Sequence, residues 1–372
     1  MKGRRKKALA MLALLVLSAA ALAVAFLAQP MFGTSPSGSR LERVSRSPHY
    51  TSGRFWNLEE TPVLVKEKGF FADLREDLFN RKEGLIPDQP IPFSKPDLEA
   101  LDRSRDLVIW LGHSSYFAQL DGIRFLVDPL FSAYASPFFF ANKAFPGSNP
   151  FTADDMPEVD FLLISHDHWD HLDYPTIAAL RQKIRNIIAG LGVGAHFSGW
   201  GFPESMIHEA DWNTALSFGE LKIHILPARH FSGRSLRENK TLWAGFALEG
   251  KEHRVFFSGD SGYGSHFAQI GETLGGFDLV SLDAGQYDEA WPYIHMTPEE
   301  AVQAAEDLKA RAFIPGHVGK FAIANHRWDE PLNRVAAAAQ EKNFRLLTPL
   351  IGEPVYLDEE KTEYPAWWRG KK

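Results

Sequence analysis

The chain has 372 residues, a formal net charge of −7, no cysteine and 14 histidines. Hydrophobic residues make up 45% of it, which is enough to bury a core and excludes a wholly disordered chain. The absence of cysteine excludes disulfides, a thiol nucleophile, a zinc ribbon and a lipobox lipid anchor. The acidic balance argues against a broad nucleic-acid surface. Imidazole is therefore the obvious chemical resource of this chain.

The first 28 residues are predicted to form a separate segment. Five cations precede Ala8, and residues 8–28 carry no charge over a length that can span a bilayer as a helix. Steps such as Ala21 to Ala23 suit a signal peptidase, so a cleaved signal and a retained anchor both stay open, and the length favours the anchor. In either case the cations stay cytoplasmic, and the exported remainder, having lost those five charges, carries −12.

The rest of the chain divides into a linker and one domain. Residues 29–55 are rich in Ser, Pro, Gly and Arg and are predicted to be a linker. Residues 56–372 are predicted to form a single domain with its core over 106–350, and 56–100 show short helical patterns between prolines.

From Asp106 onward, apolar runs and turn signals predict strands that alternate with helices later in the chain. The predicted strands are 107–120, 123–127, 159–164, 221–226, 242–248, 254–258, 277–282 and 312–314. Thr297-Pro298-Glu299-Glu300 is a capping box that opens a helix to about Lys309, and Glu330 to Glu341 also has a helical pattern. This order predicts sheets covered by helices in an α/β domain.

One cluster of histidines directly follows the predicted strand 159–164. The pattern H-x-H-x-D-H is formed by His166, His168, Asp170 and His171. Residues two apart on an extended segment point the same way, so His166 and His168 can bind one cation, while the last two residues serve a second. The pattern is too rare to arise readily by chance.

Three more candidate ligands lie where later apolar strands give way to loops that contain Gly or Pro. They are His230, Asp260 and His317. Binding groups concentrate at such positions in layered α/β proteins, although a single His before a loop can also be a hydrogen-bonded core residue. Five His and two Asp make two sites if one Asp is shared. Ligands of this kind suit Zn²⁺, with Fe or Mn as rivals.

At this point the sequence resembles the metallo-β-lactamase superfamily, and most closely its branch of N-acyl-phosphatidylethanolamine-hydrolysing phospholipase D and RomA-like proteins. The blocks that carry the resemblance are W-L-G-H-S-S at 110–115, F-L-V-D-P-L-F-S at 125–132, I-S-H-D-H-W-D-H-L-D at 164–173, P-A-R-H-F at 227–231, T-L-W-A-G-F at 241–246, F-S-G-D-S-G-Y at 257–263, H-M-T-P-E-E-A-V at 295–302 and P-G-H-V-G-K-F at 315–321. It implies an αββα sandwich with metals at one edge.

The resemblance also implies a role for each candidate residue. His166, His168 and His230 would hold a first zinc, Asp170, His171 and His317 a second, and Asp260 would bridge the two. A hydroxide shared by the two metals would then attack phosphorus or a carbonyl carbon. This makes Asp170, Asp260 and His295 the predicted catalytic residues, with His295 also touching substrate beside a helix N-terminus.

Several further residues keep two interpretations. Asp128 is either an acceptor for a ligand imidazole or a loop cap before Pro129. Lys320 is either a substrate contact or a solvated loop lysine. His113 is expected to bond the backbone rather than line the site. The aromatic segment 134–151 forms either an acyl-chain groove or membrane-dipping loop, or a lid on the core.

A glycine-rich run at 190–195 matches a dinucleotide-binding pattern. The residues after it include Gly199, Gly201 and Pro203, which form helices poorly, so a loop is predicted there and no nucleotide site.

The predicted function is a dizinc hydrolase of lipid-like or amphiphilic phosphodiesters, of the phospholipase D type. The alternatives are a lactonase or other carboxylic-ester or amide hydrolase on the same site, a di-iron oxidoreductase, and a non-catalytic envelope protein. The expected partners are a small-molecule or lipid substrate and a membrane bound through residues 8–28, without nucleic acid. The expected location is the cell envelope of a bacterium, anchored or periplasmic.

Overall fold

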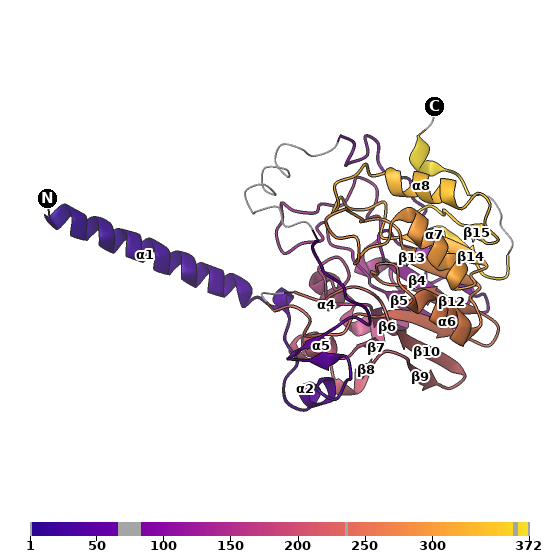
Figure 1. Cartoon of the computed structure of the whole chain (residues 1–372), viewed down its shortest axis with the longest axis horizontal. Coiled ribbons are helices and arrows are strands. Elements are labelled where there is room, and N and C mark those ends of the chain that lie inside the picture. Colours follow the sequence, from indigo (N-terminus) through magenta and orange to yellow (C-terminus); the bar gives the residue numbers. More distant parts are fainter. Residues whose placement is uncertain (1, 66–82, 235–236, 360–363, 371–372) are drawn as a thin grey trace.

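The computed structural model describes residues 2–65, 83–234, 237–359 and 364–370. Its body consists of two seven-stranded sheets with helices on their outer faces, which confirms the predicted αββα sandwich (Figure 1). Each sheet combines antiparallel hairpins with parallel strands, and strands with a parallel neighbour lead into all the predicted ligands except His230, which follows an antiparallel strand.

The first sheet has the strand order β16-β3-β4-β5-β6-β7-β8. Its strands are β3 (Leu107–Trp110), β4 (Tyr116–Leu120), β5 (Ile123–Val127), β6 (Val159–Ile164), β7 (Ile184–Gly190), β8 (Ile207–Ala210) and β16 (Pro354–Tyr356). The prediction of one strand over 107–120 is wrong in its middle. Gly112 and His113 have φ of 92° and 55°, which end β3 and turn the chain before β4 begins.

The second sheet has the strand order β15-β14-β13-β12-β11-β10-β9. Its strands are β9 (Thr214–Phe218), β10 (Leu221–Leu226), β11 (Gly245–Glu249), β12 (Arg254–Phe257), β13 (Leu279–Asp283), β14 (Ala312–Gly316) and β15 (Arg345–Leu346). The prediction of a strand from 242 is wrong at its start, because Leu242 bonds to Leu191 of the other half of the molecule and Ala244 to Ser165.

The helices are short apart from the first one. They are α1 (Lys2–Leu27), α2 (Gly38–Val44), α4 (Tyr174–Leu180), α5 (Gly194–Gly199), α6 (His266–Leu274), α7 (Pro298–Asp307) and α8 (Glu330–Ala338). The capping box at Thr297 is present, since its amide donates to Glu300 Oε2 at 2.8 Å. Of the helical patterns predicted over 56–100, residues 66–82 lie outside the described part, and 56–65 and 83–100 contain no helix.

The glycine-rich run leads into α5, so the prediction of a loop there is wrong. The amides of Gly192 and Gly194 both donate to Glu209 Oε1, at 2.7 and 2.9 Å. These are the amides that would meet a phosphate in a dinucleotide site. A carboxylate of the chain itself already occupies them, which explains the glycines without a nucleotide.

The core lies between the two sheets. The ring of Tyr116 on β4 is 5.0 Å from that of Phe257 on β12, and the hydroxyl of Ser281 on β13 donates to the Tyr116 hydroxyl oxygen. Around this contact the side chains that face the other sheet are fully buried, Ala118 and Phe246 among them. Each phenylalanine buried in this way stabilises the fold by about 1.5–3 kcal/mol, so the sheets form a rigid base for the loops at their edge.

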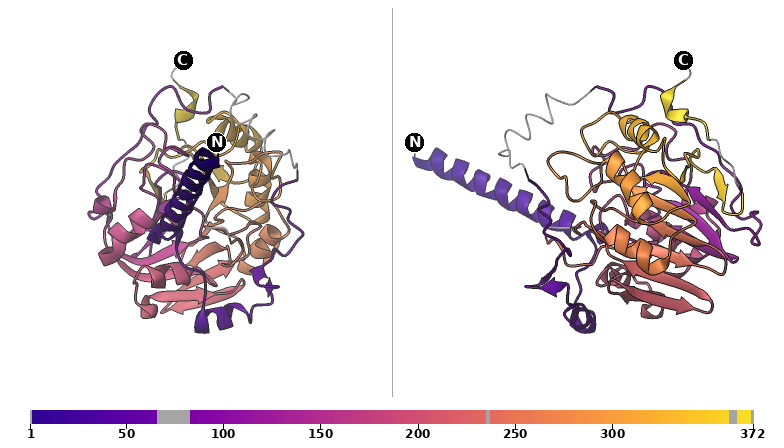
Figure 2. Two further views of the ribbon diagram at one scale, coloured as in Figure 1. Left: turned by 90° about the vertical axis from the view of Figure 1, so that its left-hand side faces the viewer. Right: turned by 45° about the vertical axis from the view of Figure 1, so that its right-hand side comes forward.

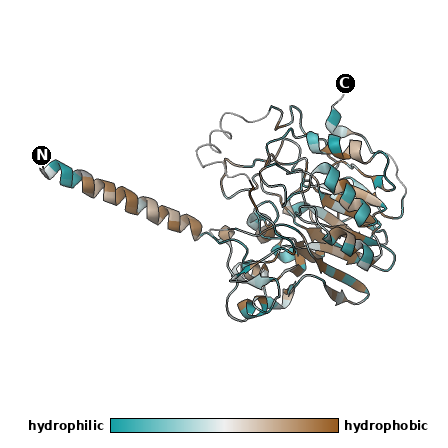
Figure 3. Ribbon diagram, in the orientation of Figure 1, coloured by the Kyte–Doolittle hydropathy of each residue, from teal (hydrophilic) through white to brown (hydrophobic). Residues whose placement is uncertain are grey.

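The segment predicted as a linker lies against the domain. Val44 and Phe55 are buried, and the indole nitrogen of Trp200 donates to Pro30 O at 2.7 Å. Two short strands follow, β1 (Tyr50–Thr51) and β2 (Arg54–Phe55). Of the helices in the described part of the chain, only α1 projects away from the body (Figures 1 and 2). It is the one described helix whose length and composition suit a membrane span, with its polar end farthest from the domain (Figure 3).

Arg40 on α2 provides a test of this packing. Its guanidinium lies 2.7 Å from Glu209 and 2.6 Å from Glu204, and the Glu209 side chain is only 2% exposed. We expect Arg40→Met to lower the free energy of unfolding by about 2 kcal/mol, because removing one partner leaves a buried charge poorly compensated. Arg43 also reaches Glu209 but is half exposed, so Arg43→Met should cost less than about 1 kcal/mol. Chemical unfolding of the full chain in mild detergent measures both, and equal effects would contradict the packing.

Candidate metal centre

The predicted ligands come from the ends of four strands or the loops that follow them. β6 leads into His166, His168, Asp170 and His171, β10 leads to His230, β12 to Asp260, and β14 to His317. These strand ends meet at one edge of the sandwich, where parallel strands place their carboxyl termini together. The structure brings all seven residues into two adjoining groups.

The first group consists of three imidazoles and one carboxylate. His168 Nδ1 lies 2.8 Å from His166 Nε2 and 3.2 Å from His230 Nε2. Asp260 Oδ2 lies 3.8 Å from His166 Nε2 and 3.7 Å from His230 Nε2. Ligands of one tetrahedral zinc, with Zn–N near 2.0–2.1 Å, lie about 3.3 Å apart, so these atoms surround a space of suitable size.

The second group is built around Asp170. Its Oδ2 lies 2.9 Å from His113 Nε2, 3.2 Å from His317 Nε2 and 3.6 Å from His171 Nε2. Asp260 Oδ1 faces this group, 3.1 Å from His171 Nε2. Asp260 therefore directs one oxygen to each group, as a bridging ligand would.

The donor atoms of this centre are not fully used by the protein. Within the described residues, His171 Nε2, Asp260 Oδ1 and His113 Nδ1 are buried without a hydrogen-bond partner. Buried polar atoms are rarely left so, because each costs about 1–3 kcal/mol. A cation between the groups would satisfy the first two atoms at once, so the residues present fit the metals that the sequence predicts.

The charges of the site separate its ligands into two kinds. Burial lowers the pKa of His166 and His230 well below the usual range, which keeps both imidazoles neutral and able to donate a lone pair. Burial alone would also lower the pKa of His171, but the carboxylates of Asp260, Asp170 and Asp128 raise it well above its ordinary value. The second group therefore attracts positive charge strongly.

The outward nitrogens of His171 and His230 are each held by a second residue. Asp128 Oδ2 lies 2.8 Å from His171 Nδ1, and it also accepts the hydroxyl of Ser165 at 2.5 Å. Ile294 O lies 2.9 Å from His230 Nδ1. These contacts select the tautomer that leaves Nε2 facing the centre. Asp128 thus lies where an acceptor for a ligand imidazole was predicted.

Sequence reasoning missed two residues of the site, Asp283 and His113. Asp283 ends β13, and its oxygens lie 2.7 Å from His295 Nδ1 and 3.1 Å from His317 Nδ1. His113 was expected to bond only the backbone, yet its ring reaches Asp170. The sequence did contain a signal for His113. Gly112 and His113 interrupt an apolar run, which indicates that the strand ends there and that the chain turns.

The structure places the two predicted substrate contacts differently. His295 lies 5.0 Å from His230 and 5.1 Å from His317 between ring centroids, so it adjoins both groups. Lys320 is fully buried, and its Nζ donates to Leu130 O at 2.7 Å. Its amine thus bonds a backbone carbonyl beneath the surface. Lys320 is therefore neither the substrate contact nor the solvated loop lysine that the sequence predicted.

Comparisons with known proteins identify the family of this chain. Residues 123–318 match the family model of the beta-lactamase superfamily domain, which is more than half of the chain. The chain belongs to this superfamily.

Three relatives are informative. The Mycobacterium tuberculosis protein Rv0906 is 40% identical over 328 residues, which is 87% of this chain and 88% of the relative. The outer membrane protein RomA of Klebsiella pneumoniae is 54% identical over 101 residues, 27% of this chain and 76% of the relative. The N-acyl-phosphatidylethanolamine-hydrolyzing phospholipase D 1 of Caenorhabditis elegans is 32% identical over 231 residues, 57% of this chain and 63% of the relative. They confirm the predicted branch.

Among solved structures, Igni18, a metallo hydrolase of Ignicoccus hospitalis, superposes with a TM-score of 0.53 at 19% identity. The match covers 68% of this chain and 99% of Igni18. At this identity the likeness shows the fold alone.

Lys320 gives a prediction of how stability depends on pH. Burial lowers the pKa of its amine from 10.5 to about 7. Between these values the unfolded chain binds the proton and the folded one does not, so wild-type stability rises with pH, by about 1.4 kcal/mol per unit. Below pH 7 the Lys320 amine is charged in the folded and in the unfolded chain. The full cost of burying this charge then lowers the free energy of unfolding.

Lys320→Met removes this penalty, so its stability relative to wild type should be highest near pH 6.5 and fall by about 2–3 kcal/mol by pH 9. Unfolding at both pH values measures it. The half-exposed Lys222→Met is the control and should show no such trend. A pH-independent difference for Lys320→Met would contradict the buried amine.

Proposed function

We propose that this chain is a dizinc phosphodiesterase of the phospholipase D type, acting on a lipid-like or amphiphilic phosphodiester. The observation that carries the proposal is Asp260, whose two carboxylate oxygens face two different groups of imidazoles. The name of the Caenorhabditis elegans relative supports the phosphodiester class. The name of RomA and the apolar helix α1 support a place in the cell envelope.

Zinc ions held by the two groups would polarise the scissile phosphate and lower the pKa of a water between them. The residues of the chain supply orientation. Asp128 and Asp283 hold His171 and His317 from behind, so that their Nε2 atoms stay aimed at the centre. The domain's own charge of −12 beyond residue 28 is unfavourable to an anionic substrate, so the local site has to provide the attraction.

His295 is the group that we assign to the substrate. Asp283 engages its Nδ1 at 2.7 Å, which leaves Nε2 available beside both imidazole groups. α7 begins three residues further on, and the positive end of its dipole favours an anionic oxygen nearby. His295 can therefore bind a phosphate oxygen and hold a proton at Nε2 for the leaving group.

Metal content combined with a substrate panel tests the proposal. Wild-type protein should contain about two zinc per chain, hydrolyse phosphodiesters and phospholipids, and lose this activity with a chelator. Asp260→Asn should lose metal and more than about 100-fold in turnover, since even outer-shell changes cost 10–100-fold. Asp278→Asn, at the opposite edge of the sheet, is the matched control. Turnover of lactones alone would favour the carboxylic-ester alternative, and two redox-active irons would favour the oxidoreductase.

His295→Ala separates substrate binding from metal binding. We expect turnover to fall by about 10²–10⁴-fold, the usual contribution of a positioned acid or base, while zinc content stays at the wild-type value. His253→Ala, whose imidazole pairs with Asp106 away from the centre, should leave turnover within about twofold. His295 also belongs to a third group of possible metal donors, together with Asp260, Asp283 and His317. Loss of zinc in His295→Ala would therefore show that His295 is a metal ligand and not a substrate contact.

A further inference from the structure

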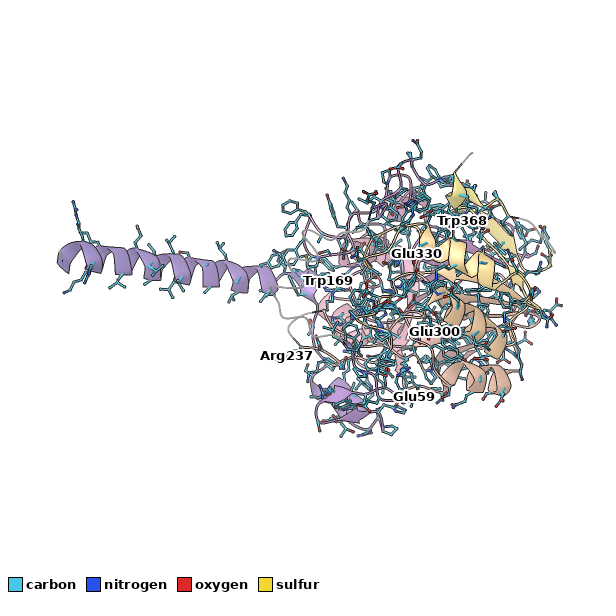
Figure 4. All side chains as sticks on the ribbon, turned by 45° about the horizontal axis from the view of Figure 1, so that its top comes forward. Glu59, Trp169, Arg237, Glu300, Glu330 and Trp368 are labelled. Atoms are coloured by element: carbon cyan, nitrogen blue, oxygen red, sulfur yellow. The ribbon has the colours of Figure 1, made fainter. Side chains whose placement is uncertain are left out.

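The end of α1 rests on the loop that carries the first metal ligands. The ring of Phe32 lies 5.2 Å from Trp169, which stands between His168 and Asp170 in the chain, and 5.1 Å from Phe26 at the end of α1. Phe26 in turn stacks on Phe138 at 5.5 Å. Trp169 is labelled close to the point where α1 reaches the body (Figure 4). The helix therefore leaves the domain at the site itself.

Arg234 fixes the chain that follows α1 to this loop. Its Nε donates to Met31 O at 2.6 Å and another nitrogen donates to Asp167 O at 3.1 Å. Its guanidinium lies 4.2 Å over the ring of Trp169, and the residue is only 4% exposed. A buried arginine with these partners resists displacement, so the direction of α1 is coupled to the metal-binding loop.

The exposed apolar side chains of the domain are unevenly distributed. Outside α1, the large apolar residues that are exposed in the described part of the chain lie in residues 41–93, in 138–140 and at Tyr293, and helices α4 to α8 and the strands contribute none. Phe139 and Phe140 are 78% and 74% exposed, the highest values among them. Several of these segments border the centre, since Asn57 bonds His230 and Tyr293 precedes Ile294, the acceptor of that histidine. Among these residues, Phe138, Phe139 and Phe140 contact one another and Phe26 at the end of α1, and such a cluster of exposed rings marks an interaction surface.

The geometry of α1 identifies the occupant of this surface as a lipid bilayer. Its 26 residues span about 39 Å at 1.5 Å each, against about 30 Å of hydrocarbon. The cations at its start lie at the far end, and its apolar side chains are exposed along its whole length. A bilayer that surrounds α1 therefore ends beside Phe138, where the exposed phenylalanines stand. Seen end-on, α1 lies in front of the boundary between the two halves of the sandwich (Figure 2).

We propose that α1 is retained as a membrane span and that the loop with Phe138, Phe139 and Phe140 enters the adjoining leaflet, so that the metal centre faces the bilayer surface and takes its substrate from it. The statement about substrate rests on the proposed function, whereas the orientation does not. The aromatic segment 134–151 combines two of its predicted roles. Phe145 and Phe151 are buried in the core, which supports the lid. The exposed tip of the segment supports the membrane-dipping loop.

Single-cysteine labelling tests the orientation, because the chain has no cysteine of its own. The full chain with Phe139→Cys, carrying an environment-sensitive fluorophore, is reconstituted into vesicles of phosphatidylcholine and phosphatidylethanolamine that contain dibrominated phosphatidylcholine. We expect the emission to shift to the blue and to be quenched by the brominated lipid. Arg311→Cys is the matched control, 79% exposed just before β14 at the opposite edge of the sheet, and should be unaffected.

Equal quenching at the two positions would overturn the proposal, as would a mature chain whose intact mass shows that α1 has been removed. Phe140→Cys repeats the measurement at a second exposed position, and thermal unfolding of each variant confirms that it is folded.

Activity supplies the second arm. In Phe139→Ser/Phe140→Ser, the ratio of turnover on a vesicle-embedded phosphodiester lipid to turnover on soluble bis(4-nitrophenyl) phosphate should fall about tenfold. Arg311→Ser should leave this ratio unchanged. A wild-type protein that turns over neither substrate refutes the phosphodiesterase while the quenching result still decides the orientation. An unchanged ratio in the double variant overturns delivery of substrate from the bilayer.

Discussion

The structure depends on one buried carboxylate, that of Asp260, shared between two groups of imidazoles. Its side chain is 2% exposed, with His166 and His230 on one side and His171 on the other. So many ionisable groups could not be buried together without strong mutual compensation, because unpaired charge in a protein interior costs several kcal/mol. The imidazoles lower the pKa of Asp260 well below its usual value although burial alone would raise it. The edge of the sandwich is arranged to make this compensation possible.

The arrangement has a conformational cost that the sheets offset. His113, Asp128 and His317 all have positive φ, at 55°, 42° and 59°, and each contacts the second group or supports it. Such backbone costs of order 1–3 kcal/mol per residue and persists only where the surroundings enforce it. Here β3, β5 and β14 hold the preceding residues, and His317 N donates to His113 O at 3.1 Å, which fixes two of the three against each other. The strained residues therefore indicate function rather than a loose loop.

The sequence allowed the ligands to be predicted because their signal is local. The spacing of His166, His168 and His171 reports a turn after a strand, and His230, Asp260 and His317 stand where apolar runs end. Asp283 was not predicted because its partners His295 and His317 are 12 and 34 residues away. The parallel pairing of β13 with β14 brings it to His317, and the loop before α7 brings His295 to it. Contacts set by sheet pairing leave no periodic trace in one sequence.

Two errors have related causes. Lys320 was predicted to be either a substrate contact, because it lies three residues from His317, or a solvated loop lysine. The chain instead turns through Gly319, at φ 70°, and directs the Lys320 amine to Leu130 O. Residues 29–55 were assigned to a linker from composition, yet Arg40 and Phe55 attach them to the domain. In both cases proximity in sequence or composition was outweighed by a buried polar contact with a residue more than 150 positions away.

The charge of the chain gives the membrane contact a physical purpose. A domain carrying −12 beyond residue 28 is repelled by the negative surface potential of an anionic leaflet, so electrostatics would keep substrate and centre apart. An apolar span is insensitive to that repulsion, and it turns the search for a lipid into an encounter at high effective concentration. The helix α1 can bring the metal centre to the bilayer only if the direction of the helix is fixed relative to that centre. Arg234 meets this requirement, since it bonds both Met31 and the loop of His168, and this makes anchor and metal centre one mechanical unit.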